Sequence, residues 1–154
     1  MSDVFTKSKR SEVMSLIRGK GNASTEMRLV AHFREHGITG WRRHVAITFS
    51  DLSGLKNSGR RRTRKVKPDF VFPRAKLAVF VDGCFWHGCP RHATQPKNNA
   101  AFWRDKIAAN QLRDRRVTRL LRSRGWSVCR IWECRLKKQP DVVVRRINRM
   151  LGGQ

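Results

Sequence analysis

The sequence predicts an α/β domain in which a mixed β-sheet is flanked by helices. Short runs of β-branched and aromatic residues alternate with longer segments of helical periodicity, in the order helix, helix, strand, strand, strand, helix, strand, helix. The 154 residues are the usual length of one domain. Hydrophobic residues make up 39% of the chain, which is enough for a core. We therefore expect residues 1–154 to form a single domain.

Two helices are predicted near the N-terminus, over residues 8–20 and 24–36. The first is short and basic, with its apolar residues on one side. The second has Ser24 as a candidate N-cap and ends before Gly37. Both therefore have the start and stop signals of amphipathic helices.

Three strands are predicted next, over residues 41–49, 69–72 and 77–81. The first shows partial alternation with β-branched residues. The other two are short apolar runs joined by a turn over residues 73–76 that begins with proline.

The C-terminal third predicts a helix, a strand and a second helix. The longest helix covers residues 100–124 and ends at Gly125. An apolar run over residues 126–132 predicts a strand, and apolar residues at helical spacing predict a final helix over residues 141–151.

Residues 50–67 predict an exposed basic loop inserted between two strands. The segment is rich in serine and glycine and contains a cluster of basic residues. Contact with nucleic-acid phosphates and simple solvation of an insertion are both compatible with this composition. The basic cluster comprises Arg60, Arg61, Arg62, Arg64 and Lys65.

The net charge of +24 indicates a polyanionic partner, with nucleic acid as the first candidate. A ribosome-bound or membrane-surface protein is the alternative. No apolar run approaches the ~20 residues that span a bilayer. The first ten residues carry no apolar secretory signal. We therefore expect no membrane segment and a cytoplasmic location.

Four cysteines suggest a structural zinc site, because disulfides are rare in a reducing cytoplasm. Cys84, Cys89 and His92 lie within one short loop. Cys134 or Cys129 can supply a fourth ligand, and Cys134 is favoured because Cys129 lies inside an apolar run. Three thiolates and one imidazole form a closed tetrahedral zinc site. The alternative is a set of unrelated buried thiols.

Two carboxylates occupy positions suited to a divalent ion. Asp69 follows Pro68 at the start of one predicted strand, and Asp82 follows the next. Hydrolysis of a phosphodiester with Mg²⁺ needs such hard oxygen ligands at one point. The arrangement resembles the PD-(D/E)xK nucleases, although Cys84 stands where their lysine belongs.

Three further residues are candidates for proton transfer or metal binding. His87 can accept a proton from water, or it can replace His92 as a zinc ligand. Asp114 lies on an otherwise apolar helix face, where it can pair with His87 or with an arginine. Glu26, in the first turn of a helix, can offset the helix dipole or hold metal-bound water.

Three aromatic residues lie close to these candidates in the sequence. Phe85 and Trp86 stand between Cys84 and His87, and Trp103 opens the longest predicted helix. Large rings beside a nuclease site can stack on bases or insert between them. Packing in the core is the alternative for all three.

The run VFVDGCFWHGCP at residues 79–90, preceded by Pro68-Asp69, closely resembles the very short patch repair (Vsr) DNA mismatch endonucleases. The resemblance covers nearly the whole chain. Its further matches are Arg10-Ser11, Met14, Phe102-Trp103, Lys106, Asn110, residues 113–116, Gly125-Trp126 and residues 132–134.

This resemblance implies a fold similar to type II restriction endonucleases of the PD-(D/E)xK type, with one structural zinc. It implies Mg²⁺-dependent nicking of duplex DNA on the 5′ side of the thymine in a T:G mismatch. Such mismatches arise by deamination of 5-methylcytosine, so a cytosine-5 DNA methyltransferase is the implied functional partner. We expect a monomeric bacterial enzyme associated with the nucleoid.

The resemblance also implies roles for individual residues. Asp69 and the carbonyl of Val81 would bind Mg²⁺, His87 would be the general base with Asp114 as its partner, and Glu26 would hold metal-bound water. The implied zinc ligands are Cys84, Cys89, His92 and Cys134. Phe85, Trp86 and Trp103 would enter the base stack beside the mismatch. The N-terminal helix around Met14, within residues 1–22, would lie against the DNA from the other side.

Two features depart from the family pattern. Some members have histidine at the position of Asp82, where an acid can add a metal ligand. The basic segment over residues 50–67 is longer than the usual connection before the Pro-Asp pair.

Overall fold

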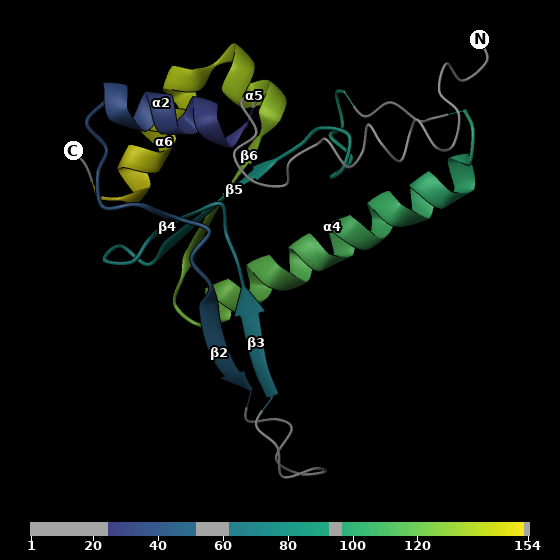
Figure 1. Cartoon of the computed structure of the whole chain (residues 1–154), viewed down its shortest axis with the longest axis horizontal. Coiled ribbons are helices and arrows are strands. Elements are labelled where there is room, and N and C mark those ends of the chain that lie inside the picture. The colour runs from purple at the N-terminus through teal and green to yellow at the C-terminus, as the bar shows by residue number, and fades with distance from the viewer. Residues whose placement is uncertain (1–24, 52–61, 93–96, 153–154) are drawn as a thin grey trace.

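A four-stranded mixed sheet forms the centre of the computed structural model (Figure 1). The structure describes residues 25–51, 62–92 and 97–152. The order across the sheet is β1-β4-β5-β6; β5 pairs antiparallel with β4 and parallel with β6. The strands are β1 (Arg42–Arg43), β4 (Phe70–Phe72), β5 (Leu77–Asp82) and β6 (Ser127–Trp132).

Helices cover both faces of this sheet, which confirms the predicted α/β arrangement (Figure 1). One face packs against α2 (Glu26–Glu35), α5 (Glu133–Lys138) and α6 (Pro140–Met150). The other face packs against α4 (Ala100–Ser123). No helix in the described part of the chain is both long and apolar enough to cross a membrane.

The alternation of side chains along β5 builds two cores. Leu77 and Val79 point to the core beneath α2, α5 and α6, whereas Ala78 and Phe80 belong to the core beneath α4. The first core centres on Phe33, whose ring contacts the ring of Phe70 at 5.3 Å between centroids. Because β5 contributes to both cores, both of its faces are apolar, as expected for a central strand.

The predicted strand over residues 41–49 is wrong as a single element. It divides into β1 and β2 (Ile47–Asp51), which belong to different sheets. The break falls at His44, whose φ of 53° lies in the left-handed region and cannot continue a strand. The change of direction lets residues 47–51 leave the central sheet.

Part of the predicted basic loop is also a strand. Residues 62–66 form β3 (Arg62–Val66), which pairs antiparallel with β2 from Ile47↔Val66 to Asp51↔Arg62. This ribbon extends from the body of the protein (Figure 1). Ile47, Phe49 and Val66 anchor it to the core beneath α4. Arg60 and Arg61 lie outside the described residues.

The remaining helices follow the sequence pattern closely. α2, α4 and α6 agree with the predictions within about two residues, the usual uncertainty of helix ends. α5 is an addition that the sequence analysis did not predict. The helix predicted over residues 8–20, with Met14, and the candidate N-cap Ser24 lie outside the described residues.

Candidate functional site

The sheet topology brings the predicted acidic residues together at the C-terminal end of β5. Phe70 pairs with Val79, so Asp69, one residue earlier, lies beside the end of the neighbouring strand. The backbone N–H of Val81 donates a hydrogen bond to Asp69 Oδ2 at 2.7 Å. A cavity of about 720 Å³ opens here and is lined by Glu26, Asp69, Val81, Asp82, Trp86, His87, Trp103 and Asp114, among others.

Asp69 lies in an environment that disfavours its ionised form. Burial, together with the negative charges of Glu26 and Asp82, raises the pKa of this carboxyl from 3.8 to about 6. The hydrogen bond from Val81 and the charge of Arg130 act in the opposite direction. A divalent cation would relieve both the burial cost and the repulsion between acids. The donor set therefore fits Mg²⁺, which prefers carboxylate oxygens.

Glu26 is buried beside Asp69, although its sequence position also suited a solvent-exposed acid at a helix start. Its Oε2 accepts a hydrogen bond from Arg43 at 2.7 Å and lies 2.8 Å from Nε2 of His44. The backbone N–H of His44 also donates to the carbonyl of Asp69 at 3.2 Å. His44 thus connects two of the acidic positions.

His87 and Asp114 form the closest ion pair of the cavity. Nδ1 of His87 lies 2.5 Å from Oδ2 of Asp114 and 3.7 Å from Oδ1 of Asp82. Hydrogen bonding through Nδ1 favours the tautomer in which Nε2 carries the free lone pair. Nε2 can then accept a proton from a water molecule in the cavity.

Arg130 is a member of the site that the sequence analysis did not identify. It comes from β6 and donates from Nε and Nη2 to both carboxylate oxygens of Asp82, at 2.8 and 2.9 Å. Nη2 also lies 3.0 Å from Oδ1 of Asp114. Asp114 therefore makes both contacts that the sequence left open, one with His87 and one with an arginine. Each carboxylate oxygen of Asp82 thus accepts a hydrogen bond from Arg130.

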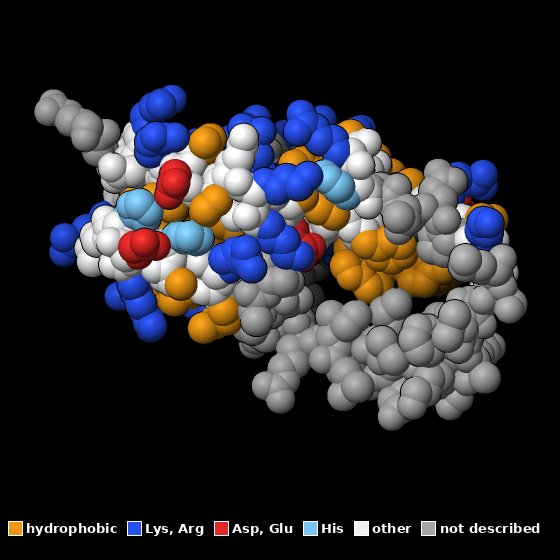
Figure 2. Space-filling model, turned by 90° about the horizontal axis from the view of Figure 1, so that it is seen from above, with side chains coloured by type: hydrophobic (Ala, Val, Ile, Leu, Met, Phe, Trp, Pro, Cys, Tyr) orange, Lys and Arg blue, Asp and Glu red, His pale blue; other side chains and the backbone are white. Residues whose placement is uncertain are grey.

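The predicted aromatic residues form one cluster beside the cavity. Trp103 lies 5.2 Å from Phe85 and 5.8 Å from Trp86 between ring centroids. Phe102, next to Trp103, is 61% exposed. Figure 2 shows an apolar patch and an acidic group beside a hollow, with basic side chains next to the acidic group. The three predicted rings are half-buried, so neither pure core packing nor free exposure describes them.

Helix α4 fixes the loop that carries His87 and the aromatic residues. Asn110 donates to the carbonyl of Trp86 at 2.9 Å, and Gln111 donates to the carbonyl of His87 at 3.3 Å. Gly88 lies against the same helix with φ +64°. A Cβ at that position would come within 2.8 Å of Ile107, so only glycine fits this close approach.

A second cluster brings together the four predicted zinc ligands. The ligand atoms of Cys84, Cys89, His92 and Cys134 all lie within 4.8 Å of one another. Sγ of Cys89 is 3.8 Å from Sγ of Cys134 and 3.7 Å from Nδ1 of His92. Ligands at the tetrahedral zinc–sulfur distance are ~3.8 Å apart, so the spacing suits this metal. Cys129 lies in the core instead, and His87 faces Asp114.

The thiols of this cluster differ in acidity. Burial, together with side-chain hydrogen bonds to Cys134 and Cys89, raises the pKa of the Cys84 thiol to about 12. Burial acts in the same direction on Cys89, but hydrogen bonds from Arg91 and His92 outweigh it and lower its pKa to about 7. Cys89 is therefore the thiol most ready to bind a metal as a thiolate.

The predicted DNA-contacting basic residues are placed only in part. Lys65 lies on β3 and lines the large cavity, and Arg64 is exposed on the same strand. Arg62 begins β3. Met14, Arg60 and Arg61 lie outside the described residues.

The sequence of the chain is similar to those of several known proteins. Residues 52–93 match the family described as "DNA mismatch endonuclease Vsr". The chain is 35% identical over 153 residues to the type II nicking enzyme V.NmeAIP of Neisseria meningitidis, covering 98% of this chain and 95% of that protein. It is 31% identical over 159 residues to the DNA mismatch endonuclease Vsr of Escherichia coli, covering 100% of this chain and 90% of that protein.

A further relative is similar over a shorter segment. The type II nicking enzyme V.NaeI of Lentzea aerocolonigenes is 54% identical over 69 residues. That segment covers 45% of this chain and 42% of the relative, so the match spans less than half of the relative's length.

Proposed function

Because the chain belongs to the family of Vsr DNA mismatch endonucleases, we propose that it nicks duplex DNA on the 5′ side of the thymine in a T:G mismatch. The reaction depends on Mg²⁺ and initiates repair of deaminated 5-methylcytosine. A cytosine-5 DNA methyltransferase is the functional partner. The observation that carries the proposal is a single cavity that holds Asp69, the His87–Asp114 pair and two of the clustered aromatic rings.

The fold belongs, in this proposal, to the restriction-endonuclease-like class. Asp69 and the carbonyl of Val81 hold the magnesium, and Glu26 orients water next to it. When bound, Mg²⁺ polarises the scissile phosphate and stabilises the departing oxygen. Supporting this assignment, Asp69 is held by the Val81 N–H in a pocket that also contains Glu26.

Proton transfer is assigned to His87. Nε2 takes a proton from the attacking water, and the negative charge of Asp114 stabilises the resulting imidazolium. Arg130 contacts Oδ1 of Asp114, so the other oxygen of Asp114, Oδ2, is directed to His87. We assign Asp82 to the anchoring of Arg130 rather than to the metal, because Arg130 donates to both of its oxygens.

Mismatch selectivity is assigned to the aromatic cluster. Unstacking a base step costs least at a weakly paired mismatch, so Phe85, Trp86 and Trp103 can enter the stack there more readily than in a matched duplex. The contact of these rings with each other keeps them beside the cavity. The basic residues of β3 and of the segment before it contact the DNA backbone.

The first test compares a labelled duplex containing one T:G pair with its T:A control. We expect Mg²⁺-dependent nicking of the T:G duplex and a rate at least about 10²-fold lower on the T:A duplex, since extra unstacking costs a few kcal/mol. Equal nicking of both duplexes would indicate a nuclease of this fold with another site or structure specificity. Absence of nicking, with DNA binding retained, would indicate a zinc-stabilised DNA-binding protein.

The second test separates the general base from the zinc ligands. His87→Ala should lower the nicking rate by about 10²- to 10⁴-fold, the usual contribution of a general base. Asp114→Asn should cause a smaller loss, because the imidazole remains. Zinc content, measured by atomic emission, should stay unchanged in both variants. Loss of zinc from His87→Ala would show that His87, and not His92, is the metal ligand.

A further inference from the structure

A second cavity shares Asp114 and Arg130 with the candidate active site but lies along a different stretch of α4. Its volume is about 570 Å³. It is lined on one side by Arg115, Thr118, Arg119 and Arg122 of α4, and on the other by Arg130 of β6. We call this cavity the arginine groove. No function described above uses its three helix arginines.

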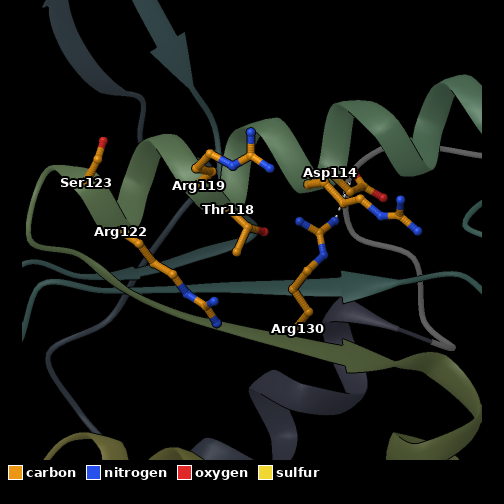
Figure 3. Close-up of a pocket in the computed structure, with 7 residues that line it drawn as sticks. Asp114, Thr118, Arg119, Arg122, Ser123 and Arg130 are labelled. Atoms are coloured by element: carbon orange, nitrogen blue, oxygen red, sulfur yellow. Dashed lines mark ion pairs between the residues drawn. The ribbon is translucent and has the colours of Figure 1, made fainter.

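The groove follows from helical periodicity and from the sheet order. Positions 115, 118, 119 and 122 fall on one face of α4 because their spacings are three and four residues. β6 is the edge strand of the four-stranded sheet. In Figure 3, Arg122 extends from the helix towards β6, Arg130 extends from β6 towards the helix, and Thr118 lies between them.

The helix arginines of the groove lack acidic partners. Among the described residues, no carboxylate lies within ion-pair distance of Arg115, Arg119 or Arg122. Asp114, which also lines the groove, is already paired with His87 and Arg130. Like charges at helical spacings of three and four residues destabilise a helix. A bound anion would remove that repulsion.

Two polar atoms at the groove also lack partners within the described part of the chain. Oγ1 of Thr118 and Nη1 of Arg130 are buried and make no hydrogen bond there. Leaving such donors unpaired costs free energy, but both atoms are shielded from solvent, so the exposed guanidinium groups are what the groove offers a ligand. Both atoms belong to residues that line the groove.

We propose that the arginine groove binds a backbone phosphate of the DNA, away from the bond that is cleaved. Guanidinium groups match the oxygens of a phosphate in a bidentate geometry. A DNA phosphate is favoured over a small anion because the whole chain is strongly basic, with a net charge of +24. The proposal rests on the proposed function only in taking DNA as the ligand.

The experiment compares two triple variants with the same loss of charge. The groove variant carries Arg115→Gln, Arg119→Gln and Arg122→Gln. The matched control carries Arg34→Gln, Arg145→Gln and Arg149→Gln, which replaces exposed arginines of α2 and α6 on the opposite face of the sheet. The dissociation constant of a long matched duplex is measured by fluorescence anisotropy across a range of salt concentrations.

We expect the groove variant to bind DNA at least about 10-fold more weakly and to reduce the salt slope by about 1, since each lost phosphate contact removes ~0.9. The control should change the slope by much less.

Three outcomes would overturn the proposal. Equal slope changes in the two triple variants would show a general effect of charge. Unchanged DNA binding with loss of thermal stabilisation by inorganic phosphate in the groove variant alone would assign the groove to a free anion. Weaker nicking at saturation with unchanged binding would assign it to catalysis. Because binding is measured on a matched duplex, failure of the mismatch activity itself would leave this test valid.

Discussion

Replacing Asp69 with asparagine is expected to lower the nicking rate of a T:G duplex by at least about 10³-fold, because the metal stabilises transition-state charge by several kcal/mol. Asparagine has nearly the same shape, and its Oδ1 can still accept the hydrogen bond of Val81. The fold should therefore remain, and DNA affinity should not fall. Single-turnover nicking and fluorescence anisotropy measure the two quantities separately.

Asp105→Asn is the matched control for that variant. Asp105 lies on α4, 76% exposed at its side chain, and its substitution removes the same charge. We expect it to nick at the wild-type rate. Near-normal nicking by Asp69→Asn would remove Asp69 from the metal site, whereas equal losses in both variants would point to a non-specific effect of charge.

The raised pKa of Asp69 provides a second readout of the same variant. The pKa of about 6 in the folded protein exceeds the ordinary value of 3.8, so the folded state binds the proton more tightly. The associated stability is complete below the ordinary pKa and is lost as the pH rises through about 6. In metal-free buffer, wild type should lose stability relative to Asp69→Asn across this interval. A constant difference between the two unfolding free energies would contradict the assignment.

Loss of the zinc cluster is expected to have the largest effect on stability. Structural zinc contributes about 10–16 kcal/mol of apparent binding free energy in small domains, which exceeds the net stability of most proteins. Cys134→Ser removes one ligand at the start of α5 and detaches it from the loop that holds Cys84 and Cys89. We expect less than one zinc per chain, a lower melting temperature and loss of nicking, because His87 lies in the same loop.

Cys129→Ala is the control for the zinc prediction. Its thiol is fully buried in the core beneath α2, α5 and α6, away from the proposed metal ligands. It should keep one zinc per chain, while the small cavity reduces stability by an amount typical of a core truncation. A full complement of zinc in Cys134→Ser, or loss of zinc in Cys129→Ala, would reverse the choice between the two cysteines.

The fold could be predicted from the sequence where the apolar residues of one helix or strand follow a regular pattern within that element. α4 and β6 have continuous patterns over many residues, and both lie where expected. β3 could not be predicted, because its residues are mostly basic and polar, and among residues 63–66 only Val66 is buried. Its strand conformation depends on pairing with β2, which is a contact between distant parts of the chain. The turn of the backbone at His44 likewise has no signal in the local sequence.

The residues of the candidate site likewise divide into those that the sequence pattern could predict and those that only the three-dimensional packing reveals. Asp114 was identifiable because a carboxylate on an apolar helix face needs a partner, and the structure gives it two. Arg130 could have been found by the same reasoning, since it alternates with buried residues along β6. It was missed because it is one of 35 basic residues. His44 has no neighbouring motif, and only the packing of α2 against β1 reveals it.

The double hydrogen bond between Asp82 and Arg130 has a consequence for the evolution of the family. A histidine in place of Asp82 would leave the guanidinium with Asp114 as its remaining carboxylate and would put a second imidazole next to His87. Relatives with histidine there should therefore have lost the arginine on β6, and the two positions should change together. In this chain, replacing Asp82 with histidine or removing Arg130 alone should be more harmful than making both changes, as a double-mutant cycle would measure.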